Sequence, residues 1–252
     1  MKKFFNIVCI LCAVLSLAAC GTEEKENPVV AEEQESKEIK AQAGEIEVSS
    51  IEELNEVVPR EVETHIAALN EKYEKLTGEI DTYDKYIQNI DQVEAFYADV
   101  YQDTKDICIR MREYCLKYGE IILESDKTDD EKYDDLDEMY DVVYDEAGDE
   151  IYDGYYDGVL DEVYDMFYDG ILDEAHDTAE YEEWLDARSE EYELWLDTRS
   201  DTYEEWLDFR SESYEFWLDM KEEFWNGDME KAKEKMQDFQ EDINKLKEDQ
   251  SQ

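Results

Sequence analysis

Residues 181–189 read Tyr181-Glu182-Glu183-Trp184-Leu185-Asp186-Ala187-Arg188-Ser189, and near copies of this unit begin at Tyr192, Tyr203 and Tyr214. The repeat length is eleven residues, which make very nearly three turns of an α-helix, so equivalent side chains form a nearly straight stripe. Trp184, Arg188 and Tyr192 are each four residues apart, a spacing that can stack a guanidinium between aromatic rings. We therefore predict one helix over residues 181–225.

The segment before this helix has a different period. From Asp137 to Asp177 an aspartate occurs at every fourth position, and two mostly apolar residues precede nearly every one. A twelve-residue repeat is superimposed, since the sequence of residues 156–162 returns in similar form at residues 168–174. Strict alternation is absent, which argues against strands and predicts a helix over residues 132–180. On such a helix a four-residue period drifts by about 40° per repeat, so the apolar stripe should wind right-handedly around the axis.

Residues 49–125 follow a heptad pattern. Ser50 and Glu53 are predicted to form a capping box, and a seam of apolar and aromatic a and d positions runs from Ile66 to Ile122. Such a seam needs a partner helix. We expect a single helix over residues 51–124.

Together these patterns predict an all-α protein, a long antiparallel helical hairpin or coiled coil in which residues 51–124 run along a helix of residues 132–225. A short third helix, residues 228–250, is expected to fold back over the Trp repeats, with Trp217 near Met236 or Phe239. The alternative is a compact bundle of shorter helices, in which the middle helix breaks near Gly148, Gly154, Gly158 or Gly170.

The N-terminus differs from the rest of the chain. Lys2 and Lys3 precede an apolar run that ends at Leu17, too short to span a bilayer and typical of a signal-peptide core. The run closes with Leu17-Ala18-Ala19-Cys20, which resembles the lipobox of bacterial lipoproteins. That resemblance implies removal of residues 1–19, lipidation of Cys20 and attachment to the extracytoplasmic face of the cell membrane.

Residues 20–48 contain almost no large apolar side chains and many Glu, Gln, Ser and Lys residues. This composition predicts a disordered tether between the lipid anchor and the helices. The tandem Tyr/Trp units further along are similar to those of poorly characterised lipoproteins of Gram-positive bacteria. That resemblance supports the predicted location and gives no information on activity.

The charge balance restricts the partners. With 74 Asp+Glu against 24 Lys+Arg, the formal net charge is −50. Nucleic acid and anionic lipid headgroups bind positively charged surfaces, so neither is expected as a direct partner. Divalent cations, basic proteins and neutral glycans remain, as does a homodimer.

The aspartate row is the first candidate site. Like charges four residues apart repel on a helix, and bound Ca²⁺ or Mg²⁺ would relieve that repulsion. No EF-hand spacing is present, so binding would be weak and multiple; the other interpretation is a solvated face. The candidate ligands are Asp141, Asp145, Asp149, Asp153, Asp157, Asp161, Asp165, Asp169 and Asp173.

The tryptophan row is the second candidate site. A line of flat rings could hold a glycan or a peptide, or it could belong to the core or a coiled-coil seam. The residues are Trp184, Trp195, Trp206 and Trp217. Trp225 is out of phase with them and should mark the end of the helix.

The sequence carries no recognisable catalytic motif, and neither an enzyme activity nor a cofactor is expected. His65 and His176 join no Ser, Cys or carboxylate in a nucleophilic arrangement, and there is no Gly-rich phosphate loop. Cys108 and Cys115 are seven residues apart on one helix, beyond disulfide reach. They are either buried apolar residues or an interchain bridge in a homodimer.

The sequence therefore predicts a non-enzymatic, membrane-anchored lipoprotein that acts as an elongated coiled-coil scaffold or interaction protein of the bacterial envelope. The alternative is a ligand-binding module, either for divalent cations through the aspartates or for glycan or peptide through the tryptophans.

Overall fold

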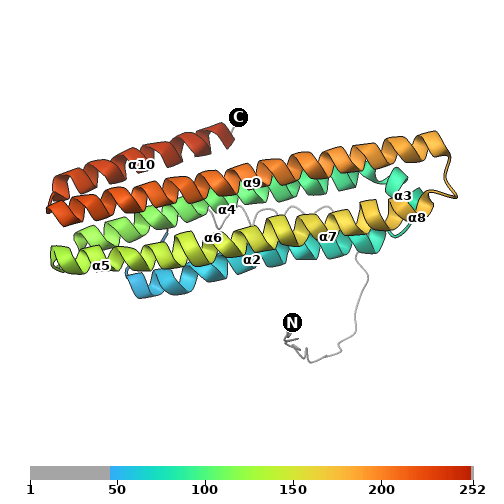
Figure 1. Ribbon diagram of the computed structural model, residues 1–252. Helices are drawn as coiled ribbons and strands as arrows, with labels where there is room; N and C mark the ends of the chain where they lie inside the picture. The colour runs from blue at the N-terminus through green and yellow to red at the C-terminus, as the bar shows by residue number, and fades with distance from the viewer. Residues whose placement is uncertain (1–45, 251–252) are drawn as a thin grey trace, which may run out of the picture. The chain divides into compact units, whose positions relative to one another are not determined.

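A computed structural model describes residues 46–250, and every regular element in that range is helical (Figure 1). The predicted all-α class is confirmed. The predicted signal peptide, Cys20 and the predicted tether up to residue 45 lie outside the described residues. Among residues 46–250, no helix is both long enough and apolar enough to cross a membrane.

The segment expected to form one helix over residues 51–124 forms a hairpin. Helix α2 (Ile51–Glu79) is followed by the short α3 (Tyr83–Gln88), and α4 (Ile90–Glu124) packs back along α2. The expectation of a continuous helix is wrong because the heptad stays in phase through the turn. Ile80 lies between α2 and α3 and is fully buried, as a seam residue would be.

The segment expected to form one helix over residues 132–225 is also divided. The chain turns at residues 176–180, where the twelve-residue repeat gives way to the eleven-residue repeat. None of the four glycines named for the alternative arrangement marks this break. After the turn, α9 (Tyr181–Asn226) runs back as a single helix.

The part before the turn alternates between α-helical and π-helical segments, and we call it the rod. Thr128 and Glu131 form a capping box at its start. Its segments are α5 (Asp129–Met139), η1 (Tyr140–Ala147), α6 (Gly148–Ile151), η2 (Tyr152–Val159), α7 (Leu160–Tyr164), η3 (Asp165–Leu172) and α8 (Asp173–Ala175).

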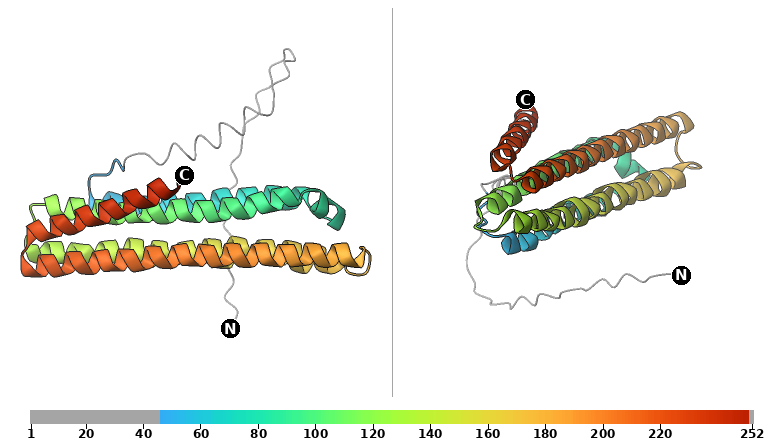
Figure 2. Two further views of the ribbon diagram at one scale, coloured as in Figure 1. Left: turned by 90° about the horizontal axis from the view of Figure 1, so that it is seen from above. Right: turned by 60° about the vertical axis from the view of Figure 1, so that its left-hand side comes forward.

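Four long segments thus form an antiparallel bundle (Figures 1 and 2). Helix α2 packs on α4 and on the rod. Helix α9 also packs on α4 and on the rod. The core runs along the whole bundle, because each segment contributes fully buried apolar side chains such as Leu54, Val100, Phe167 and Phe209. Burial of this kind is the main source of helical stability in proteins.

The last helix, α10 (Met229–Gln250), folds back over the Trp-repeat end as predicted. Gly227 ends α9 with φ 68°, the left-handed conformation that glycine adopts most readily. The Asp228 carboxylate accepts a hydrogen bond from the Lys231 backbone N–H at 3.2 Å, so Asp228 caps α10.

The contact between α10 and α9 uses a neighbour of the expected tryptophan. Phe239 stacks on Phe216 with a 4.4 Å separation of ring centroids. Trp217 instead faces the rod, where its ring is 4.9 Å from that of Tyr140.

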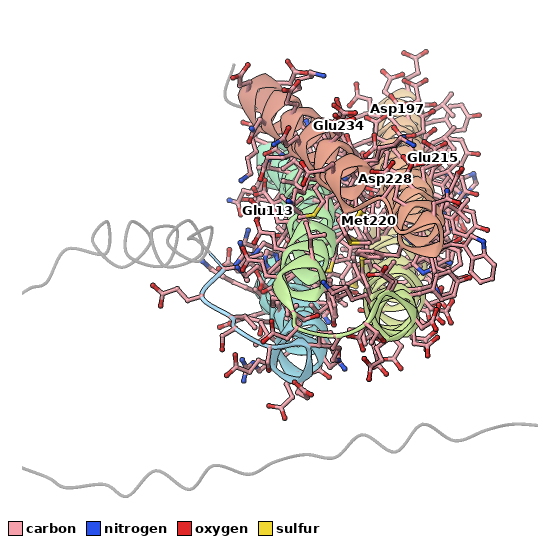
Figure 3. All side chains as sticks on the ribbon, turned by 90° about the vertical axis from the view of Figure 1, so that its left-hand side faces the viewer. Glu113, Asp197, Glu215, Met220, Asp228 and Glu234 are labelled. Carbon is pink, nitrogen blue, oxygen red and sulfur yellow. The ribbon has the colours of Figure 1, made fainter. Side chains whose placement is uncertain are left out.

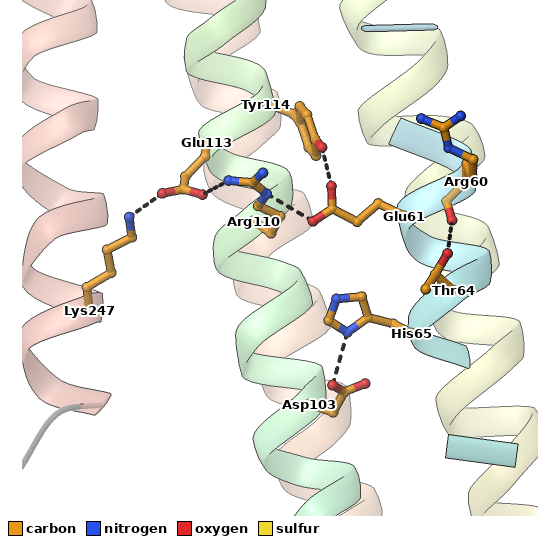
Figure 4. A network of polar contacts seen from close by, with 9 residues as sticks. All are labelled: Arg60, Glu61, Thr64, His65, Asp103, Arg110, Glu113, Tyr114 and Lys247. Carbon is orange, nitrogen blue, oxygen red and sulfur yellow. Dashed lines mark hydrogen bonds and ion pairs between the residues drawn. The ribbon is translucent and has the colours of Figure 1, made fainter. Parts of the chain in front are cut away.

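A polar network joins three helices at this end (Figure 4). Arg110 of α4 donates hydrogen bonds to Glu61 of α2 at 3.0 Å and to Glu113 at 2.9 Å. Tyr114 donates to Glu61, and Lys247 of α10 pairs with Glu113. The far end of α10 is therefore held to α4.

Candidate functional site

The repeats of the rod face the repeats of α9, and each pair of repeats makes the same contact. The rod contributes stacked tyrosine pairs, Tyr140–Tyr144 at 4.7 Å, Tyr152–Tyr156 at 4.8 Å and Tyr164–Tyr168 at 4.7 Å. The first tyrosine of each pair packs on a tryptophan of α9, in Tyr140–Trp217 and Tyr152–Trp206 at 4.9 Å and in Tyr164–Trp195 at 4.4 Å. The second packs on a tyrosine of α9, in Tyr144–Tyr214 at 5.6 Å, Tyr156–Tyr203 at 5.5 Å and Tyr168–Tyr192 at 5.7 Å.

An arginine of α9 completes each of these sets, which we call aromatic stations. In the middle station the Arg199 guanidinium lies 3.9 Å from the centre of the Tyr156 ring and pairs with Asp161 and, at 3.6 Å, with Asp157. The two neighbouring stations repeat the arrangement. Arg210 lies over the Tyr144 ring and pairs with Asp149. Arg188 lies over the Tyr168 ring and pairs with Asp173. The predicted stacking of each arginine on the tryptophan four residues earlier is confirmed, and Arg199 lies 5.2 Å from the centre of the Trp195 ring. The second ring is a tyrosine of the rod, where the tyrosine four residues later in α9 was predicted.

The rod keeps its apolar side chains on one face because its π segments raise the average number of residues per turn. In an ordinary α-helix a four-residue period drifts by about 40° per step, so ten successive positions would pass around the whole helix. The rod buries every one of ten such positions, Met139, Val143, Ala147, Ile151, Tyr155, Val159, Val163, Phe167, Ile171 and Ala175. The π segments use hydrogen bonds one residue longer than those of an α-helix, which brings the average close to four residues per turn. The expected winding of the stripe is therefore wrong.

The same π segments match the twelve-residue repeat to the eleven-residue repeat. One unit of α9 makes just over three turns and advances about 16.5 Å. A unit of the rod also makes three turns, because its π segment takes up the additional residue. The three aromatic stations consequently stay in register along the interface.

Glycines in the repeat relieve crowding inside the π segments. A Cβ atom on Gly158 would lie 2.8 Å from the backbone oxygen of Asp153, five residues earlier. The equivalent distance at Gly170 is 3.2 Å, to Asp165. The repeated glycines thus serve the π-helical backbone.

The aspartate row lies on the exposed side of the rod, and part of it is already paired. Asp149, Asp157, Asp161 and Asp173 contact the arginines of the stations, and Asp137 pairs with Lys221 at 2.7 Å. The other predicted cation ligands, Asp141, Asp145, Asp153, Asp165 and Asp169, are exposed. Within residues 46–250 no three His, Cys, Asp or Glu side chains are grouped so that they could hold a metal ion.

The predicted tryptophan face is an internal contact. Trp184 is buried, and Trp195, Trp206 and Trp217 are half-buried. The indole N–H of Trp184 donates to the Leu172 carbonyl at 2.6 Å, and that of Trp206 to the Gly148 carbonyl at 2.7 Å. These rings join α9 to the rod and do not form an open platform for a glycan. Trp225 is exposed beside the C-terminus of α9, as predicted for a residue at the end of that helix.

The exposed apolar surface of α9 is formed by other residues of the same repeat, which the sequence analysis missed. The leucine after each tryptophan is about half exposed, Leu185 at 43%, Leu196 at 45%, Leu207 at 46% and Leu218 at 44%. The tyrosine that opens each repeat is also exposed. We call the set of Leu185, Leu196, Leu207, Leu218, Tyr181, Tyr192, Tyr203 and Tyr214 the leucine ridge.

Buried polar groups cross-link the bundle. Glu191 of α9 is 1% exposed and accepts hydrogen bonds of 2.7 Å from the hydroxyls of Tyr86 and Tyr97. Burial raises the pKa of Glu191, and the two hydroxyl donors offset part of that rise.

The two histidines have separate surroundings. His65 of α2 lies 3.0 Å from Asp103 of α4, whose other oxygen accepts a 2.6 Å hydrogen bond from Tyr155 of the rod. His176 is exposed, and its ring meets that of Trp184 edge-on at 4.7 Å.

Both cysteines of the described residues are free and buried. Burial raises the pKa of Cys108 and of Cys115 to about 12. Their position favours the interpretation as buried apolar residues, because an interchain bridge would require the bundle to open.

No protein-family model matches the sequence, and the comparisons with curated proteins and with solved structures found no match either.

Proposed function

We propose that the protein is a non-enzymatic lipoprotein that stands on the extracytoplasmic face of a bacterial membrane as an elongated helical scaffold and interaction protein. One observation carries the proposal. The repeats pack their tryptophans, tyrosines and basic side chains against the rod, while the leucine after each tryptophan, together with the exposed part of each tyrosine, forms a regular row on the outside of α9.

The aromatic stations support the scaffold part of the proposal. Each combines ring packing, a cation–π contact and an ion pair, and the set recurs along a helix of 46 residues, which is about 69 Å long. Repeated cross-links of this kind hold two long helices in one register. A fixed register is what a scaffold needs in order to present a surface at a set distance from its anchor.

The two ligand-binding alternatives have less support. Five aspartates of the row, among them Asp149 and Asp161, already have basic partners in α9, so a cation would compete with those partners. The tryptophans pack against the rod, so a glycan would have to displace tyrosine rings.

Metabolic labelling with an alkynyl palmitate tests the anchor in bacterial cells that express the full chain. The wild type should be labelled, Cys20→Ala should lose the label, and Cys12→Ala should retain it, because only Cys20 stands at the end of the lipobox. An unlabelled wild type, or label retained by Cys20→Ala, would contradict the lipoprotein assignment.

Site-specific photocrosslinking in the same cells tests the interaction part. A photoreactive amino acid at Leu196 on the leucine ridge should yield a discrete adduct with another protein. The same amino acid at Glu71, which is exposed on α2, is the control and should yield none. Identical patterns from the two positions, or no adduct from Leu196, would contradict a role for this face.

A further inference from the structure

The leucine ridge concentrates the exposed apolar surface of the protein on one helix. Scattered apolar side chains are normal on a protein surface, whereas a contiguous set marks an interaction site. Within residues 46–250, the exposed large apolar side chains all belong to α9. Eight of those nine side chains form the ridge, and the ninth is Trp225.

The spacing of the ridge is that of a helix–helix seam. Tyr192 and Leu196 are four residues apart, and Tyr203 follows seven residues after Leu196. Residues at such intervals share one face of a helix, and a repeat of eleven keeps that face nearly straight. From Leu185 to Leu218 the ridge extends over about 50 Å. A partner helix with the same three-turn period can therefore meet it along its full length.

Charge identifies the chemistry of the partner. Helix α9 carries sixteen acidic residues and four basic ones, and all four basic residues turn toward the rod, where they pair with aspartates. An aspartate follows each ridge leucine, at Asp186, Asp197, Asp208 and Asp219. Figure 3, which looks along the bundle, places Asp197 and Glu215 at its periphery and Met220 between the helices. A second copy of the chain would bring the same acidic flank against itself, so a basic partner fits and a homodimer does not.

Helix α10 shows within this chain how a helix docks on these acidic positions. Lys235 of α10 pairs with Asp219 at 2.8 Å, and Lys231 pairs with Glu223 at 3.9 Å. In the same contact between α10 and α9, Phe239 stacks on Phe216. Asp219 holds the same repeat position as Asp186, Asp197 and Asp208. The aspartate after each leucine is therefore suited to a lysine of an amphipathic helix.

We propose that the leucine ridge binds a basic amphipathic α-helix of a partner protein, whose apolar residues recur every eleven residues. This inference rests on the proposed function and names the class of partner. Leucine or similar side chains of the partner helix cover the ridge, and its lysines or arginines pair with the aspartates beside it.

A designed peptide provides the probe. It has three eleven-residue units, each with leucine at positions one and five, alanine and glutamine at the other positions and three lysines beside the leucines. The control peptide has the same composition with the leucines distributed around the helix. Fluorescence anisotropy of the dye-labelled peptides is measured against the full-length protein in detergent, at low and at physiological salt.

The patterned peptide should bind at least tenfold more tightly than the control peptide, and binding should weaken as salt increases. The variant Leu196→Ser/Leu207→Ser should lose at least tenfold in affinity for the patterned peptide. The variant Glu71→Gln/Glu74→Gln on α2 should bind like the wild type. All changed residues are exposed, so circular dichroism should show unchanged helicity in both variants.

Equal binding of the two peptides would overturn the proposal, since it would reduce the attraction to charge alone. Unchanged binding by the leucine variant would overturn it as well. So would self-association of the wild type that Leu196→Ser/Leu207→Ser abolishes, because the occupant would then be a second copy. These failures differ from those of the proposed function, which would be lost with the Cys20 label or with the Leu196 adduct.

Discussion

The carboxylate of Glu191 on α9 accepts a 2.7 Å hydrogen bond from the hydroxyl of Tyr97 on α4, inside the bundle. A second neutral donor, Tyr86, lies at the same distance. Burial raises the pKa of Glu191 above its ordinary value, so the folded protein holds this proton more tightly than the unfolded chain. The contribution of Glu191 to stability is therefore full below the ordinary pKa of glutamate and is lost as pH rises through the raised value.

Replacing Glu191 with glutamine should remove this pH dependence. As pH rises from below the ordinary pKa of glutamate to above the raised pKa of Glu191, Glu191→Gln should gain stability relative to the wild type, by about 1.4 kcal/mol for each unit of the pKa rise. Urea unfolding followed by tryptophan fluorescence over a series of pH values measures the difference. Glu190→Gln changes an exposed neighbour and is the control. Parallel pH profiles of Glu191→Gln and the wild type would show that Glu191 does not titrate as argued.

Arg199 should stabilise the middle aromatic station through its planar group as well as its charge. Arg199→Lys keeps the charge and loses the stacking on Tyr156, and we expect it to cost about 1 kcal/mol. Arg60→Lys, at an exposed position of α2, is the control and should change stability by less than about 0.5 kcal/mol. Denaturant unfolding compares the two, and a double-mutant cycle with Tyr156→Leu should reveal a coupling energy. Equal stability of Arg199→Lys and the wild type would contradict this role.

The rod should tolerate the loss of one residue better than α9 does. Deleting Asp153 within η2 removes the additional residue of a π segment, so the flanking stations keep their face and cooperative unfolding should persist. Deleting the exposed Asp201 in α9 rotates every later side chain by about 100° and should abolish cooperative unfolding. Thermal melts followed by circular dichroism distinguish the two deletions. A reversed order of tolerance would show that the π segments do not act as inserted residues.

Cys108 and Cys115 should be inert in the native protein. Their burial and raised pKa values of about 12 leave little exposed thiolate. An alkylating reagent should modify them only after unfolding in denaturant, as mapped by mass spectrometry of the labelled peptides. Non-reducing electrophoresis should show no disulfide-linked dimer. Rapid native labelling of either residue, or a dimer that reductant dissociates, would favour the interchain bridge.

Periodicity predicted the buried faces of the helices better than their ends. The heptad correctly marks Leu76, Ile80 and Cys108 as buried, yet it passes through the turn around Ile80 without a change of phase. A turn that leaves the phase of the heptad unchanged cannot be recognised from the amphipathic pattern. The turn at residues 176–180 did leave a signal, because the repeat length changes there.

The site was predicted only in part, for two physical reasons. Four-residue spacing indicated the stacking of arginines, but the partner rings come from the rod, and a repeat pattern contains no information on which helices pair. The π segments could not be predicted, because a repeat pattern gives the angle between residues only if 100° per residue holds throughout the helix. The leucine ridge was not predicted, because the tryptophans and the leucines recur with the same period, and Leu185 follows Trp184 on a different face of the helix.

The match of twelve residues in the rod to eleven in α9 restricts how this protein can grow during evolution. A tandem duplication that adds one unit to α9 alone would displace every later arginine of α9 from its tyrosine in the rod. Only paired duplications, one in each arm and of unequal size, lengthen the structure without loss of complementarity. Related chains of other sizes should therefore differ by coupled increments in these two segments.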